Sequence, residues 1–185
     1  MPEDNKDDFD GNFVDDNITG IDYVEDDVYN MADDQLTEVF VYGTLKSGGE
    51  IRGLDTFNKA KQTSMVEGWP PPIANIVGKA KTVHPDFTMI DLGSFPGVVL
   101  ITTDGIPHAY VQGEVWQVNK TVLNELDMIE GHPDFYERKK TETTQGIAWM
   151  YVLPESYIKM YKGAEDESSQ VSYQDQTYIW NTIKA

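Results

Sequence analysis

The chain has 185 residues, no cysteine and a formal net charge of −18. Its length fits one globular domain with extensions rather than two full domains. The lack of cysteine excludes disulfides, thiolate nucleophiles and cysteine-based zinc sites, and the three histidines form no close ligand pair. We therefore expect no metal site.

Composition also narrows the classes of partner. No segment reaches the roughly 18 consecutive apolar residues that a membrane helix needs. The chain begins Met-Pro-Glu-Asp, with acids where a secretion signal would have basic residues. The net charge would repel nucleic-acid phosphates, and the sequence contains no basic stripe. These features predict a cytoplasmic protein that binds neither membranes nor nucleic acids.

Most of the negative charge lies at the N-terminus. Residues 1–38 carry 14 acids and one lysine, a net charge of −13, whereas residues 39–185 carry 18 acids and 13 bases, a net charge of −5. Isolated apolar residues, including Phe9, Phe13 and Tyr23, are interleaved with these acids. Two interpretations are open for residues 1–37: a solvated tail, or an acidic arm that docks on a protein partner or on the chain's own body.

From residue 38 onward, apolar runs alternate with turn signals. Strands are expected at 38–42, 76–83, 97–102, 110–118, 138–144 and 147–152. A helix is expected to begin after Asn119, a good N-cap, and to end at Gly131, with an apolar stripe of Val122, Leu123, Leu126 and Ile129. A second helix is expected from Gln174 to Lys184, with Tyr178, Ile179 and Ile183 as its apolar face, and a weaker helical pattern covers 154–162. The pattern predicts an α+β fold, a small mixed β-barrel with a few helices, made by residues 38–153, with residues 154–185 as a C-terminal helical extension.

The first expected strand ends abruptly at Tyr42 and Gly43. A turn without a side chain at Gly43 lets the backbone N–H groups of Thr44 and Leu45 converge, and such groups can hold a carboxylate, a phosphate or a developing oxyanion. An ordinary strand end would give the same pattern, so both interpretations remain open. Lys46 is expected either to neutralise a substrate carboxylate or to be solvated.

The expected helix ends at an acidic residue, Glu130. The negative pole of the helix favours the protonated form of a carboxyl there and should raise its pKa, which suits a general acid and base. An exposed glutamate in a last turn has the same signature, and Asp127 is a competing carboxylate. Tyr136 and Arg138 alternate along the following strand and so share one face. We expect Arg138 to pair with a carboxylate, whereas Tyr136 either lines a cavity or belongs to the scaffold.

Together these segments resemble the γ-glutamyl cyclotransferase-like family, which includes γ-glutamylamine cyclotransferase and the AIG2-like proteins. VFVYGTLK, at 39–46, resembles the family's first strand and substrate loop. LDMIEG, at 126–131, followed by Tyr136 and Arg138, resembles its "LDxxEG…YxR" block. Segments at 78–82, 92–98 and 111–116 agree in the same order, so the resemblance covers about residues 38–153.

The resemblance implies a function and a set of site residues. Glu130 falls on the family's catalytic glutamate, and the substrate-binding positions fall on Tyr42, Gly43, Thr44 and Leu45, with Tyr136 as a further wall of the site. The reaction would be intramolecular aminolysis of a small γ-glutamyl compound, giving 5-oxoproline and a free amine or amino acid, with no metal or cofactor.

A different class of function stays open beside this one. The fold could serve as a scaffold for a non-catalytic binding or regulatory module whose acidic arm engages a basic partner. The polar stretch 50–77 is longer than expected for the family, so it could also form a lid or rim over the site.

Overall fold

The computed structural model describes residues 35–47, 72–102, 104–160 and 168–181. Residues 1–34 and 48–71 lie outside this set, so the expectations for the acidic arm and for most of the 50–77 insertion stay predictions. The predicted domain boundaries and the cytoplasmic location stay predictions as well. Among the described helices, none is long and apolar enough to cross a membrane.

The described residues form strands and two helical segments. The strands are β1 (Thr37–Val41), β2 (Ala74–Lys81), β3 (Phe87–Asp91), β4 (Pro96–Leu100), β5 (Tyr110–Val118), β6 (Glu137–Thr143), β7 (Gly146–Val152), β8 (Val171–Gln174) and β9 (Thr177–Trp180). The helical segments are α2 (Lys120–Glu130) and a 3-10 helix, η2 (Glu155–Met160). Strands therefore dominate, as expected.

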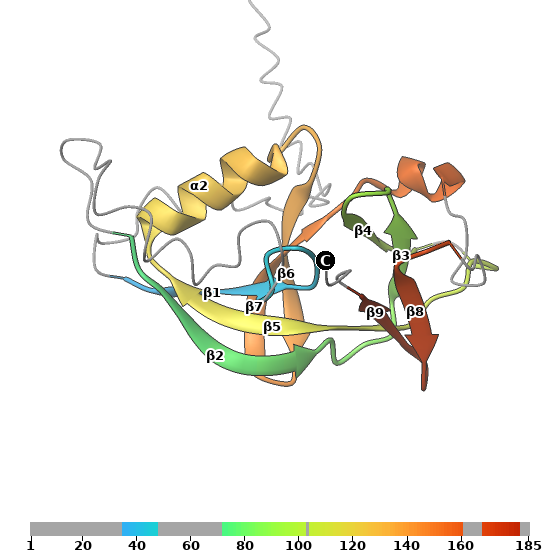
Figure 1. The fold of residues 1–185 in the computed structure, drawn as a ribbon, viewed down its shortest axis with the longest axis horizontal. Coiled ribbons are helices and arrows are strands. Elements are labelled where there is room, and N and C mark those ends of the chain that lie inside the picture. The colour runs from blue at the N-terminus through green and yellow to red at the C-terminus, as the bar shows by residue number, and fades with distance from the viewer. Residues whose placement is uncertain (1–34, 48–71, 103, 161–167, 182–185) are drawn as a thin grey trace, which may run out of the picture. The chain divides into compact units, whose positions relative to one another are not determined.

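Seven of the strands form one mixed sheet in the order β6-β7-β1-β5-β9-β8, with β2 paired to β5 outside this path. β1 runs antiparallel to β5 and parallel to β7. A bridge between Thr82 and Thr143, and a hydrogen bond from Val83 N–H to the Glu142 carbonyl at 2.9 Å, join the ends of β2 and β6. The sheet thus curls back on itself as a partly closed barrel (Figure 1), which confirms the predicted α+β mixed barrel.

Helix α2 is fixed at both ends by its own sequence. The Asn119 side chain accepts the N–H of Val122 at 3.2 Å, the role of an N-cap. Gly131 follows the helix with φ 63°, a left-handed conformation that glycine adopts without a Cβ penalty. Three fully buried side chains, those of Val122, Leu123 and Leu126, hold the helix against the rest of the domain. Glu130 is therefore held at a defined place at the end of α2.

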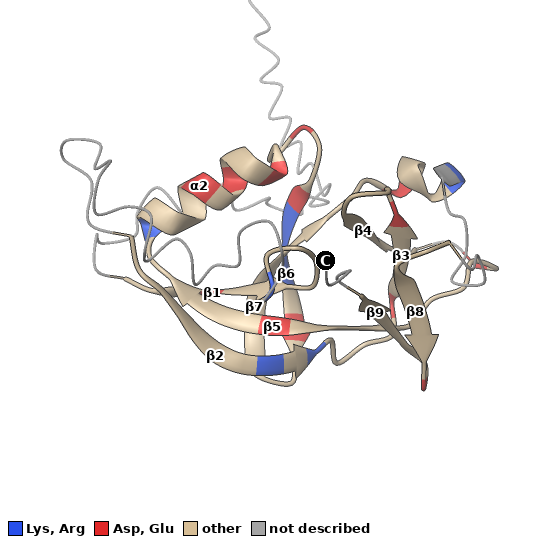
Figure 2. Cartoon of the chain, viewed as in Figure 1, with Lys and Arg blue, Asp and Glu red and all other residues tan. Residues whose placement is uncertain are grey.

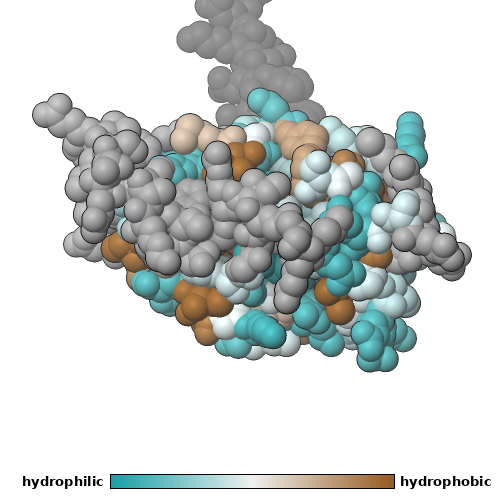
Figure 3. All heavy atoms as spheres, in the orientation of Figure 1, coloured by the Kyte–Doolittle hydropathy of each residue, from teal (hydrophilic) through white to brown (hydrophobic). Residues whose placement is uncertain are grey.

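The core lies inside the curled sheet. It brings together side chains from β1, β2, β3, β4, β5, β7, β8 and β9, among them Phe40, Met89, Val115, Met150 and Trp180. Basic residues of the described elements are divided among α2, β2, β6 and η2 rather than gathered on one strand (Figure 2). On the face in Figure 3, exposed apolar side chains form separate patches.

One predicted helix is wrong. Residues 171–174 and 177–180 form the hairpin β8–β9, where helix was expected from 174 to 184. Asp175 and Gln176 make the turn, both with positive φ (50° and 56°). β9 then pairs in parallel with β5 through Thr177 and Tyr178. The expected helix at 154–162 is the shorter 3-10 helix η2, and β3 is a strand that was not predicted.

Candidate functional site

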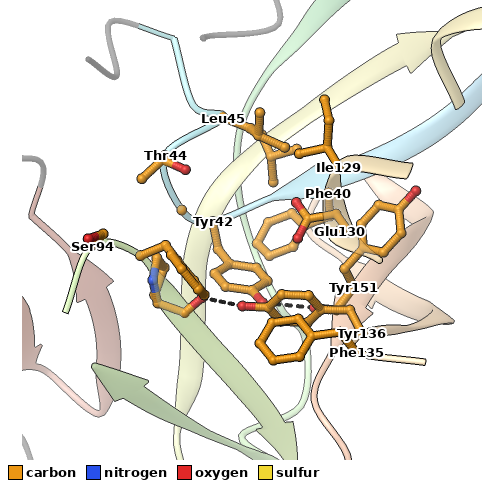
Figure 4. A pocket seen from close by; sticks show the side chains of 14 residues that line it. Phe40, Tyr42, Thr44, Leu45, Ser94, Ile129, Glu130, Phe135, Tyr136 and Tyr151 are labelled. Atoms are coloured by element: carbon orange, nitrogen blue, oxygen red, sulfur yellow. Dashed lines mark hydrogen bonds between the residues drawn. The ribbon is translucent and has the colours of Figure 1, made fainter. Parts of the chain in front are cut away.

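A pocket of about 280 Å³ opens where the end of β1 meets the end of α2. The loop after β1, the β3–β4 turn, the last turn of α2 and the segment before β6 all contribute to its wall (Figure 4). The lining residues are Phe40, Val41, Tyr42, Gly43, Thr44, Leu45, Ser94, Phe95, Pro96, Ile129, Glu130, Phe135, Tyr136 and Tyr151. The structure therefore brings all six sequence-predicted site residues, Tyr42 to Leu45, Glu130 and Tyr136, to one cavity.

The loop after β1 is held against the neighbouring turn. The hydroxyl of Tyr42 donates to the Tyr151 carbonyl at 2.8 Å and accepts the Val98 N–H at 3.3 Å. A Cβ on Gly43 would lie 2.9 Å from Cγ of Pro96, closer than real Cβ atoms come to their neighbours. Only glycine therefore fits at this position without a shift.

The loop itself is a tight turn with free donors. It is closed by a hydrogen bond from Lys46 N–H to the Gly43 carbonyl at 3.2 Å. Among the described residues, no acceptor receives the backbone N–H of Gly43, Thr44 or Leu45. Because these residues also line the pocket, their N–H groups are available to an anionic part of a ligand.

Glu130 contributes the pocket's ionisable carboxyl group. Its side chain is half-buried among apolar and aromatic neighbours, and it makes no ion pair with a described residue. Burial raises the pKa of Glu130 to about 7. The cause is desolvation of the charged form, where the sequence suggested the helix dipole. A carboxyl with such a pKa can both accept and release a proton near neutral pH.

Three tyrosines surround this carboxyl, namely Tyr42, Tyr136 and Tyr151 (Figure 4). Burial raises the pKa of each, and the charge of Glu130 adds to the effect in all three. Their hydroxyls therefore stay protonated and cannot act as bases. The hydroxyl of Tyr136 donates to the Pro96 carbonyl at 2.8 Å, which ties the wall of the pocket to β4.

Asp127, the competing carboxylate, has other partners. Nη1 of Arg138 donates to both of its oxygens, at 2.9 and 2.8 Å, and the hydroxyl of Tyr151 donates to Oδ1 at 2.6 Å. The guanidinium of Arg138 also lies over the ring of Trp149, 5.0 Å from its centroid. The prediction that Arg138 pairs with a carboxylate is confirmed. Asp127 is thereby part of the scaffold beneath the site.

Lys46 was expected either to neutralise a substrate carboxylate or to be solvated, and in the structure it does neither. Its Nζ donates to the Trp180 carbonyl at 2.9 Å, away from the pocket lining and only partly exposed. Burial lowers its pKa, and the charge of Glu114 opposes this shift. The side chain therefore anchors the loop rather than meeting a substrate or bulk water.

Several residues at or next to the site were missed from the sequence. Phe95, Phe135 and Tyr151 line the pocket but come from turns and from β7, where a linear pattern gives no sign of a shared cavity. Glu114 lies next to the site and was not singled out either, although an acid among apolar strand residues is itself a signal. Within the described residues, no group of three potential metal ligands is found.

Comparison with known proteins shows the family of the chain. The family model described as "Gamma-glutamyl cyclotransferase, AIG2-like" matches residues 39–180. The chain belongs to this family. The match extends past residue 153, where the expected resemblance ended, and takes in the β8–β9 hairpin. The family implies a small-molecule γ-glutamyl substrate.

Relatives in this family come from distant organisms. A protein of Vibrio cholerae, provisionally named a γ-glutamylcyclotransferase, is 33% identical over 119 residues, covering 64% of this chain and 84% of the relative. A similarly named protein of Methanocaldococcus jannaschii is 30% identical over 123 residues, which cover 64% of this chain and 85% of that protein. Among solved structures, an AIG2-like protein of Mus musculus is 23% identical over 64% of this chain and 77% of its own, with a TM-score of 0.47.

Proposed function

We propose that this family member releases 5-oxoproline from a γ-glutamyl amine or peptide by intramolecular aminolysis, with Glu130 as the group that moves the proton. The observation that supports the proposal most strongly is the state of Glu130. It is a half-buried carboxyl with a pKa of about 7, it has no cationic partner among the described residues, and it lines the same pocket as the open N–H groups of the loop.

The reaction needs few groups from the protein. The α-amino nitrogen of the substrate attacks its own γ-carbonyl carbon, a new C–N bond closes the lactam, and the old C–N bond to the leaving amine breaks. The α-ammonium must lose a proton and the leaving nitrogen must gain one. Glu130 takes the first proton as a carboxylate and returns it as a carboxylic acid, so one residue serves both steps.

The loop supplies the matching electrostatics. Backbone N–H groups of Gly43, Thr44 and Leu45 would hold the substrate's carboxylate or the oxyanion at the γ-carbon, and one donor of this kind typically contributes about 2.7–4 kcal/mol. Because nucleophile and electrophile belong to one molecule, the aromatic walls need chiefly to hold the substrate in its bent conformation. Tyr136 and Tyr151 are two of these aromatic walls.

A panel of γ-glutamyl amino acids, γ-glutamyl amines, γ-glutamyl-ε-lysine and glutathione tests the proposal and identifies the leaving group. Release of 5-oxoproline from any of them by the wild type, lost in Glu130→Gln, supports it. A correctly folded protein that releases none would favour the non-catalytic module. In that case, capture of a basic partner should survive Glu130→Gln and fail when residues 1–36 are deleted.

A further inference from the structure

A buried carboxyl outside the pocket forms hydrogen bonds with Ser47, at the end of the loop that follows β1. Glu114, on β5, is 7% exposed. Its Oε1 accepts the hydroxyl of Ser47 at 2.6 Å, and its Oε2 accepts the backbone N–H of Ser47 at 2.8 Å and the indole N–H of Trp116 at 3.2 Å. Ser47 directly follows the turn closed by Lys46, so one residue at the loop's exit uses both oxygens of Glu114.

The sheet places Glu114 where the same loop begins. In the antiparallel register of β1 and β5, Glu114 pairs with Val41, the last residue of β1. The neighbouring Gly113 comes so near that a Cβ there would lie 2.3 Å from the Val41 carbonyl oxygen, so β5 can approach this closely only with glycine. Both ends of the loop therefore contact the same residue of β5, Glu114.

Lys46 provides a second attachment of the loop to the sheet. Its hydrogen bond to the Trp180 carbonyl ties the loop to β9, which pairs with β5. Exit and entry of the loop are thus fixed to the sheet, whereas the N–H groups of Gly43, Thr44 and Leu45 between them are free among the described residues. A rigid frame around open donors is the arrangement expected of a preorganised anion site.

We propose that Glu114 and Ser47 are positioning residues, forming a clamp that holds the loop so that its free N–H groups point into the pocket. If Ser47 moved away, Trp116 would be the one hydrogen-bond donor left to the buried carboxyl of Glu114 among the described residues, and a buried carboxylate that loses donors is costly. The clamp therefore favours one loop conformation. Neither residue lines the pocket, so each acts through the loop. The catalytic consequence, though not the clamp itself, rests on the proposed function.

The test uses graded variants of the full chain. Ser47→Ala removes the hydroxyl donor, Ser47→Thr keeps it, and Glu114→Gln replaces one acceptor oxygen with an NH₂ group. Val118→Ala, at a buried position at the end of β5 and outside the pocket, is the control for a general loss of stability. Two quantities are measured in each: hydrogen exchange of the backbone N–H groups of Lys46 and Ser47, and kcat/KM for 5-oxoproline release.

The clamp predicts that exchange of these two N–H groups rises about tenfold in Ser47→Ala and Glu114→Gln, and that kcat/KM falls by about the same factor. Ser47→Thr and Val118→Ala should match the wild type in both hydrogen exchange and kcat/KM. Unchanged exchange in both clamp variants would overturn the proposal, as would faster exchange with unchanged kcat/KM. If the wild type itself releases no 5-oxoproline, the proposed function fails, while the exchange rates still decide whether the clamp exists.

Discussion

Asp127 and Glu130 lie three residues apart on helix α2, yet their carboxyl groups meet opposite surroundings. Asp127 accepts two hydrogen bonds from Arg138 and one from Tyr151. Glu130, in the aromatic pocket, has no ion pair with a described residue, and burial raises its pKa to about 7. Of the two acids that the sequence offered, Glu130 is therefore the one free to exchange protons.

This difference predicts the pH dependence of activity. Glu130 must be deprotonated to accept the substrate's proton, so kcat/KM should rise with pH through a midpoint near 7. The profile is measured from about pH 5 to 9 in the wild type and in Glu114→Gln, which leaves Glu130 in place. A midpoint near the usual value of 4.5 in the wild type would show that a desolvated Glu130 is not the base.

The raised pKa also predicts a stability effect. The folded state holds the Glu130 proton up to about pH 7, whereas the unfolded chain releases it near 4.5. Folding therefore binds a proton in this window, and the free energy of unfolding must fall as pH rises from 4.5 to 7. Glu130→Gln removes this loss. The free energy of unfolding of Glu130→Gln, taken relative to that of the wild type, should therefore be about 2 kcal/mol higher at pH 8 than at pH 4.5, after allowance for the partial exposure of Glu130.

Urea unfolding of both proteins at the two pH values measures this difference. A constant difference between them would contradict the burial of Glu130. Asp127→Asn, measured at the same two pH values, serves as the comparison, because it alters a carboxyl on the same helix that already has partners.

The ion pair beneath the pocket should behave as one unit. Side chains of Arg138 and Asp127 are 9% and 20% exposed, so removing either partner leaves a poorly solvated charge. Asp127→Asn and Arg138→Met should each lower the free energy of unfolding by about 2–3 kcal/mol. The double variant should lose less than the sum of the two. Additive losses in a double-mutant cycle would show that the pair is not coupled.

The contact between Gly43 and Pro96 predicts a rescue. In Gly43→Ala the new methyl would meet the Pro96 ring at 2.9 Å, so the loop must shift and kcat/KM should fall about tenfold or more. Combining it with Pro96→Ala removes the obstructing ring atoms and should restore most of the loss. The backbone carbonyl of residue 96, which Tyr136 uses, is kept. A double variant as slow as Gly43→Ala alone would place the cause elsewhere.

The sequence was informative where local signals and long-range packing agree. Helix α2 has its Asn119 cap and Gly131 stop within one segment, and strand β5 was expected at the residues where it lies. The prediction for the segment that forms the β8–β9 hairpin was wrong because Tyr178, Ile179 and Ile183 fit a helical stripe. Pairing of β9 with β5, a long-range contact, decides the conformation instead.

For the site, the loop and the helix end each gave a recognisable motif, so Tyr42 to Leu45 and Glu130 could be singled out. The cause of the raised pKa of Glu130 could not be predicted, because it depends on burial among side chains such as Phe135, Tyr136 and Tyr151, which only the fold brings together. The clamp was also invisible, since Ser47 and Glu114 are 67 residues apart in sequence.

Intramolecular aminolysis is tested most sharply by the stoichiometry of products from one γ-glutamyl substrate that the panel shows to be turned over. We expect equal molar amounts of 5-oxoproline and free amine from the wild type, no glutamate, and loss of both products in Glu130→Gln. Glutamate in place of 5-oxoproline would mean that water, not the substrate's own amine, attacks the γ-carbon. Undiminished 5-oxoproline release by Glu130→Gln would contradict the role given to Glu130.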